Sequence, residues 1–167
     1  MAKEYSVPAI ISDANILIDY LKTDRDMLRL LSHHLAPLYV ADVVAAEVSQ
    51  LKKHELSSLG ITVIETPYSI FAESSDRSSS ISLQDFVSMQ IAKEKGWVCA
   101  TNDKALRREC TKMDVTVLWG LELMLYLVKK GVLEHKRAKD TAWDIHQCNR
   151  TITESVVYSF IDRLVGL

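Results

Sequence analysis

The sequence predicts an α/β fold of three layers, built around one parallel sheet of about five strands. The main observation is that short apolar segments of strand length alternate with longer segments in which apolar residues recur at helical spacing. Strands that alternate with helices pair in parallel through right-handed crossovers. The second observation is size: 167 residues, of which 48% are hydrophobic, suffice for about one domain with a sizeable core.

Five segments have the length and composition of buried strands. Each is short and apolar, and the first ends directly at an acidic residue, Asp13. In chain order these strands are expected at residues 7–12, 38–40, 61–64, 97–100 and 115–118.

Apolar residues at helical spacing fill the stretches between the strands. Asp42 occupies a helix N-cap position after the second strand, and Gly60 ends that region. Gly96 and Gly131 stop two later helices. The serine-rich residues 74–82 are expected to form a loop with a turn or two of helix before it. Helices are expected at about residues 15–31, 42–51, 83–95, 103–110 and 120–130, with two more in 134–167 separated near Asn149.

Composition and motifs exclude several classes of protein. A net charge of −2 excludes a globally basic nucleic-acid-binding protein but leaves room for a local basic surface. Three cysteines without metal-like spacing favour a reduced, cytoplasmic protein over a disulfide or zinc scaffold. The apolar runs are too short to cross a membrane. Neither of the common glycine-rich phosphate loops is present, which disfavours enzymes that bind nucleotide cofactors through them.

Four carboxylates fall where a parallel sheet brings side chains to one edge, the carboxyl ends of its strands. Asp13 ends the first strand and Asp103 follows the fourth. Glu47 is expected one to two turns into the helix after the second strand, and Asp85 in the first turn of the helix before the fourth. Clustered carboxylates repel one another, and Mg²⁺ or Mn²⁺ relieves the repulsion. Such a metal activates water and neutralises charge on a phosphodiester.

Each acid taken alone also fits a structural role. Asp13 suits a helix N-cap, Asp103 favours the dipole of the next helix, and Asp85 follows Ser82 at the spacing of a capping box. Glu47 alone would be a solvated helix residue, although its neighbours are unusually apolar for that role. The combination of the four favours a site.

At these residues the sequence resembles the PIN-domain family of metal-dependent nucleases. Residues 11–19, 40–48, 81–85 and 100–107 are similar to its four motifs, in order, within residues 9–119. The resemblance implies a Rossmann-like α/β/α sandwich with strand order 3-2-1-4-5. It also implies a single PIN domain over residues 1–167, with a core at about 7–130 and a helical extension at about 131–167.

The resemblance implies a cytoplasmic endoribonuclease that hydrolyses RNA with Mg²⁺ or Mn²⁺ and leaves a 5′-phosphate and a 3′-hydroxyl. The catalytic acids would be Asp13, Glu47, Asp85 and Asp103, of which Asp13, Asp85 and Asp103 would bind the metal. Asn15 and Thr101 would orient carboxylates or bind phosphate. Many small members are VapC-type toxins that form dimers. A toxin–antitoxin role, with an antitoxin protein and a homodimer as partners and no membrane association, is therefore expected.

Two segments, residues 93–112 and 129–150, carry an excess of basic side chains that suits either RNA phosphates or solvated helix faces. Lys104, Arg107 and Arg108 are the best candidates for RNA binding, because they lie beside the predicted acidic site. The three tryptophans, Trp119 among them, are expected to be core or interface anchors rather than platforms on which bases stack.

Two other functions remain open. One is a catalytically inactive PIN scaffold that binds RNA or a protein partner. The other is a hydrolase of small phosphate esters, although Ala14 and Asn15 follow Asp13 where such an enzyme would have an Asp-x-Asp motif.

Overall fold

The computed structural model describes residues 6–49 and 51–167. Its sheet has five strands in the order β3-β2-β1-β4-β5, and every neighbouring pair is parallel. The strands are β1 (Ile10–Ser12), β2 (Leu38–Ala41), β3 (Ile61–Ile64), β4 (Val98–Ala100) and β5 (Val117–Leu118). The predicted α/β class and strand order are therefore confirmed.

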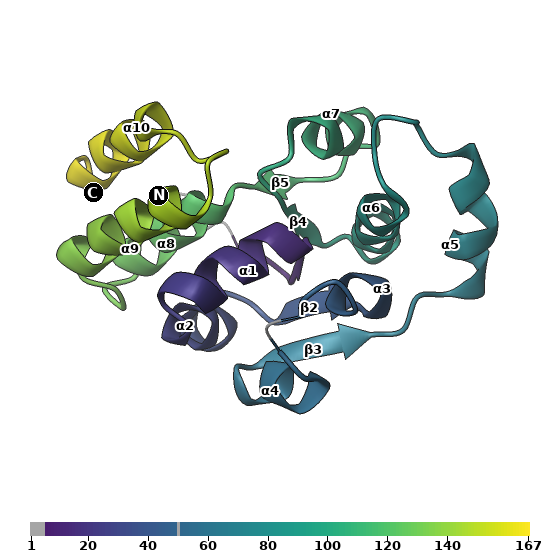
Figure 1. Ribbon diagram of the computed structural model, residues 1–167, viewed down its shortest axis with the longest axis horizontal. Coiled ribbons are helices and arrows are strands. Elements are labelled where there is room, and N and C mark those ends of the chain that lie inside the picture. The colour runs from purple at the N-terminus through teal and green to yellow at the C-terminus, as the bar shows by residue number, and fades with distance from the viewer. Residues whose placement is uncertain (1–5, 50) are drawn as a thin grey trace.

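Helices cover both faces of the sheet. They are α1 (Ala14–Thr23), α2 (Asp26–His34), α3 (Asp42–Ala45), α4 (Lys53–Ser58), α5 (Tyr68–Glu73), the 3₁₀ helix η1 (Ser74–Asp76), α6 (Leu83–Lys95), α7 (Lys104–Lys112), α8 (Gly120–Lys129), α9 (His135–Cys148) and α10 (Glu154–Val165). Helices α1 and α2 lie on one side of the strands, and α6 and α7 lie on the other (Figure 1). The C-terminal helices gather beside α1 and α2, while α5 stands out beyond α6.

Two of the helices expected from the sequence differ in the structure: the first is divided in two, and the second is shorter than expected. The first is interrupted at Asp24, which is extended and bound by Arg137 of α9. The second ends at Ala45, and a separate helix starts at Lys53 because the Glu55 carboxylate accepts a hydrogen bond from the Lys52 N–H. The expected place of Glu47 inside a helix is therefore wrong, because it lies in the turn after α3 and is exposed.

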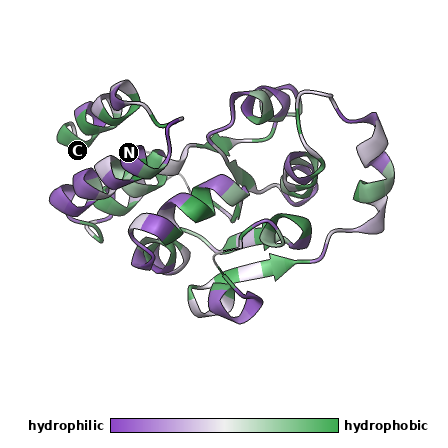
Figure 2. Cartoon of the chain, viewed as in Figure 1, coloured by the Kyte–Doolittle hydropathy of each residue, from purple (hydrophilic) through white to green (hydrophobic). Residues whose placement is uncertain are grey.

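The core is formed by the strands and by the helix faces turned towards them. Ile10 and Ile11 of β1, the central strand, are completely buried, as are Leu17 and Tyr20 of α1. Helix α6 contacts β1, β2 and β4, and its residues 86–92 are all buried, including the polar Ser88 and Gln90. Figure 2 shows hydrophobic residues along the strands and polar residues on the outer helix faces. None of the helices in the described ranges is long and apolar enough to cross a membrane.

Polar contacts attach the C-terminal helices to α1. The buried Asp19 carboxylate accepts hydrogen bonds from the Asn149 side-chain amide, at 3.0 Å to each oxygen. The Asn149 side-chain oxygen accepts in turn from the Thr151 N–H and hydroxyl, which fixes the turn between α9 and α10. Burial raises the pKa of Asp19 to about 6, and the contact with Asn149 opposes this rise. Asn149 therefore stabilises a buried negative charge.

We predict that Asn149→Ala lowers the free energy of unfolding by about 2 kcal/mol at pH 7.5, because it leaves a buried carboxylate without its donor. Urea denaturation measures this effect. The control is the same substitution in the Asp19→Asn variant. Residue 19 then carries no charge, so the loss of Asn149 should lower the free energy of unfolding by less. An equal cost in the two backgrounds would contradict the assigned contact.

Candidate active site

The candidate site lies where β1 and β4 end side by side. Asp13 directly follows β1, and its backbone N–H donates to the Ala100 carbonyl at the end of β4, at 3.1 Å. Thr101, Asn102 and Asp103 then lead from β4 into α7. Because the two strands are parallel neighbours, residues 88 positions apart in the chain come into direct contact.

The Asp13 carboxylate is buried and held at both oxygens. One oxygen accepts from the Ile16 N–H at 2.9 Å and so caps α1, while the other accepts from the Thr101 hydroxyl at 2.6 Å. The residue is only 5% exposed. Burial raises its pKa to about 6, with the charge of Asp85 adding to the rise and both hydrogen bonds opposing it. The fold therefore keeps an acid where its ionised form is costly.

Thr101 connects Asp13 to Asp103. Its fully buried hydroxyl donates to Asp13 and accepts from the Asp103 N–H at 3.0 Å. One Asp103 oxygen caps α7 by accepting from the Leu106 N–H at 2.7 Å, and the residue is exposed. Thr101 thus fixes the carboxylate of Asp13 and the backbone of Asp103 relative to each other.

Asp85 approaches this pair from α6. It forms a capping box with Ser82, donating its N–H to the Ser82 hydroxyl at 3.1 Å and accepting from the Ser82 N–H at 3.2 Å. It is half-buried, and its charge contributes to the raised pKa of Asp13. Asp13 and Asp85 therefore both cap helices, as the sequence suggested. They also lie close enough to each other for their charges to interact.

The other two predicted residues lie at the periphery. Asn15 is exposed in the first turn of α1. Glu47 is exposed in the turn after α3, a helix that contacts α6. The structure thus groups Asp13, Thr101 and Asp103 by hydrogen bonds and Asp85 by electrostatic interaction, without a direct contact from Asn15 or Glu47 in the described part of the chain.

Asp13, Asp85 and Asp103 fit a metal site that water and substrate complete better than a site built from protein ligands alone. Within residues 6–49 and 51–167, no three His, Cys, Asp or Glu side chains are grouped closely enough to hold a metal ion. None of the ion pairs in the described ranges involves Asp13, Asp85 or Asp103, although the charge of Arg107 lies near that of Asp103. Mg²⁺ commonly binds through one or two carboxylates, several waters and the phosphates of its substrate. The donor set suits that arrangement.

Basic side chains on α7 begin next to Asp103. Lys104, Arg107 and Arg108 line a shallow groove together with Thr111 and Lys112. The Arg107 guanidinium stacks on the ring of Trp119, 3.3 Å from its centroid. Partial burial lowers the pKa of Arg107, and the nearby Asp103 opposes that change. The edge that carries Asp13, Asp85 and Asp103 is thus flanked by the positively charged helix α7.

Sequence reasoning missed three residues here. Asp42 was expected at a helix N-cap, but the N-cap is Ala41 and Asp42 is the first residue of α3. Its carboxylate accepts from the Val43 N–H and from the N–H and hydroxyl of Thr66, and so ties the ends of β2 and β3 together. Asn102 accepts from the Gly120 N–H at 2.9 Å. Trp119 is 38% exposed, so it is not a core anchor, while its alternative role as an interface anchor stays a prediction. The position of Asn102 between Thr101 and Asp103 was the available signal. No sequence signal identified the exposure of Trp119.

Comparison with known proteins gives a structural likeness but no match to a protein-family model or a curated protein. Among solved structures, it is similar to a PilT N-terminus (PIN) domain protein from the archaeon Sulfolobus solfataricus P2. That likeness has a TM-score of 0.49 and 12% sequence identity, and it covers 69% of this chain and 89% of the archaeal chain.

We predict that Asp13→Asn stabilises the metal-free protein at neutral pH. The folded-state pKa of Asp13 is raised from 3.8 to about 6, so the stability that its carboxyl contributes is present below pH 4 and is lost as the pH rises through 6. The variant avoids that loss, and its free energy of unfolding at pH 8 should exceed that of the wild type by up to about 3 kcal/mol.

Urea denaturation in EDTA between pH 3.5 and 8 measures this difference, which should vanish at the acidic end. A less stable variant at pH 8 would show that the contacts with Ile16 and Thr101 outweigh the cost of burying the charge.

Proposed function

We propose that this chain is a metal-dependent endoribonuclease that hydrolyses RNA phosphodiester bonds at the edge formed by the ends of β1 and β4. The observation that carries the proposal is the buried Asp13 carboxylate, which has the charged Asp85 nearby and a hydrogen-bonded connection to Asp103 through Thr101. A purely structural helix cap does not require burial among other acids. A cation that all three carboxylates attract would make the arrangement favourable.

In this proposal Asp13, Asp85 and Asp103 would bind Mg²⁺ or Mn²⁺ directly or through metal-bound water, since no three such side chains are close enough to hold a metal together in the described ranges. The metal would neutralise charge on the scissile phosphate and lower the pKa of an attacking water. Thr101 keeps the Asp13 carboxylate in one orientation, because its hydroxyl is itself fixed by the Asp103 N–H. Glu47, exposed in the turn after α3, is proposed to complete the acidic site either through metal-bound water or as a proton acceptor.

The proposed RNA surface is the basic groove of α7. None of the ion pairs in the described ranges involves Lys104 or Arg108, so both are free to meet phosphates. Arg107 is held in place by stacking on Trp119. A strand bound along this groove would bring a phosphate to Asp103, the residue directly before α7.

A second candidate function is RNA binding without catalysis. The observation that favours it is that no three potential metal ligands are grouped in the part of the chain described. The same basic groove would then bind RNA while the carboxylates stay without metal. Roles as an antitoxin-bound toxin and as a homodimer are proposals that rest on the motif resemblance alone.

We predict that the protein cleaves a pool of single-stranded and structured RNA in Mn²⁺, that EDTA abolishes cleavage, and that Asp13→Asn lowers it at least about 100-fold. Thr101→Val keeps the acids but loses the hydroxyl, and should lower the rate by about 10- to 100-fold. Gel analysis with end-labelled RNA measures both rates and the chemistry of the new ends.

Asp19→Asn is the matched control. Asp19 is also a buried carboxylate with a pKa raised to about 6, but its partner is Asn149, outside the acidic site. This variant should retain wild-type cleavage. Equal activity in Asp13→Asn and the wild type would contradict the proposal, and RNA binding without any cleavage would favour the scaffold.

A further inference from the structure

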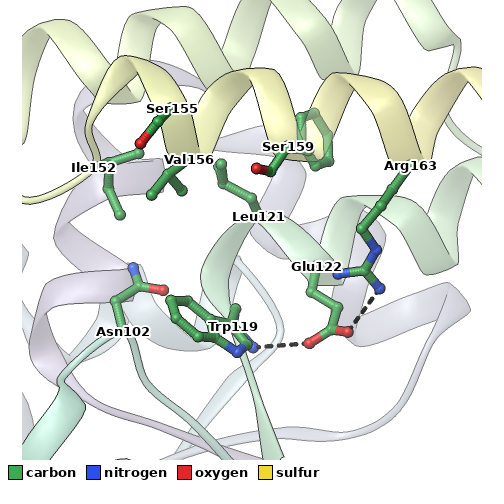
Figure 3. Close-up of a pocket in the computed structure, with 10 residues that line it drawn as sticks. Asn102, Trp119, Leu121, Glu122, Ile152, Ser155, Val156, Ser159 and Arg163 are labelled. Carbon is green, nitrogen blue, oxygen red and sulfur yellow. Dashed lines mark hydrogen bonds and ion pairs between the residues drawn. The ribbon is translucent and has the colours of Figure 1, made fainter.

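A pocket of about 370 Å³ lies between the start of α8, helix α10 and the loop that carries Asn102 (Figure 3). Its wall is mostly apolar, with Trp119 and Leu121 on one side and Ile152, Val156 and Phe160 on the other. A small number of polar groups also face it, namely Asn102, Ser155, Ser159 and the paired Glu122 and Arg163. An apolar cavity of this size with few polar groups is typical of a site for a small ligand.

The pocket adjoins the acidic site. Asn102 lines it and is the immediate chain neighbour of both Thr101 and Asp103, so their Cα atoms lie about 3.8 Å from that of Asn102. The Asn102 oxygen is committed to the Gly120 N–H. Its amide N–H groups have no acceptor among the residues described, and Figure 3 shows the side chain at the pocket wall. Asn102 therefore offers a donor to a ligand beside the acids.

Trp119 connects the pocket to the basic groove. Its ring lines the pocket, and the guanidinium of Arg107 stacks on it. Beside Trp119, the Glu122 carboxylate accepts from the Trp119 backbone N–H at 3.2 Å and from Arg163 at 2.9 Å, so its charge is compensated (Figure 3). The aromatic ring and the hydrogen-bonding groups are thus held in place without a ligand.

We propose that this pocket binds one base of a single-stranded RNA whose adjoining phosphates lie on α7 and at the acidic site. The inference rests on the proposed function and adds a pocket that would determine the specificity for the RNA substrate. Single-stranded RNA is recognised by stacking of splayed bases on aromatic and arginine planes and by hydrogen bonds to base edges. Trp119 supplies the aromatic ring, Asn102 the donor for a base oxygen or ring nitrogen, and Lys104 and Arg108 the phosphate contacts.

The test is equilibrium binding of a fluorescein-labelled oligoribonucleotide to the Asp13→Asn protein in EDTA, so that cleavage plays no part. Ser159→Phe fills the pocket from an exposed position on α10 and should weaken binding about tenfold. Asp162→Phe, exposed on the same helix and outside the pocket lining, is the matched control and should bind as before.

Salt dependence separates base contacts from phosphate contacts. Ser159→Phe should keep the slope of log affinity against log salt concentration, whereas Lys104→Ala should reduce it by about one phosphate contact. A second arm leaves the protein unchanged and scans an abasic site along the oligonucleotide. One position should lose about tenfold in affinity, and that loss should disappear in Ser159→Phe.

The inference would be overturned if Ser159→Phe and Asp162→Phe bind RNA equally and no abasic position lowers the affinity. This result is expected if the pocket binds a protein segment instead of a base. If RNA binding depends on the pocket but the wild type with Mn²⁺ cuts no RNA, the inference about the pocket stands and the proposed nuclease function is contradicted. Absence of RNA binding by every variant would overturn both.

Discussion

The Thr101 hydroxyl joins the two halves of the candidate site. It donates to the buried Asp13 carboxylate at the end of β1 and accepts from the Asp103 N–H before α7. The contact with Asp13 depends on β1 and β4 being parallel neighbours, whereas the contact with Asp103 is local, between residues two positions apart. Without this hydroxyl, Asp13 would lose one of the two hydrogen bonds that oppose the rise of its pKa.

The C-terminal helices have a role in this account beyond packing. Asn149 and Arg137 attach α9 to the acidic residues Asp19 and Asp24, which places α10 over the start of α8. The pocket beside Asn102 exists only because α10 forms one of its walls. The core of the fold therefore supplies the acids, and the helical extension supplies the surface that we propose selects the RNA.

Much of the fold could be predicted because buried strands and amphipathic helices have distinct periods in the sequence. The interruption after Ala45 could not, because helical spacing continues through Val48 and Leu51 while the Glu55 contact starts a new helix. For the same reason Glu47 was placed in a helix and is instead exposed in a turn.

The site was partly predictable for a related reason. Asp13, Asp85 and Asp103 follow from strand ends and helix starts, which the sequence marks locally. For Asp42 the sequence suggested only a helix cap. Its contact with Thr66 could not be foreseen, because that contact depends on how β2 and β3 pair. The roles of Asn102 and Trp119 depend on α8 and α10 meeting in space, which no local pattern records.

The most direct test of the central claim is where Mn²⁺ binds. In a titration of Mn²⁺ into ¹⁵N-labelled protein, paramagnetic broadening should first affect the amide signals of Asp13, Asp85 and Asp103. The acidic surface of α9 around Asp140 and Asp144 provides an internal comparison. Broadening that starts at Asp140 and Asp144, with Asp13 unaffected, would contradict a metal site at the ends of β1 and β4.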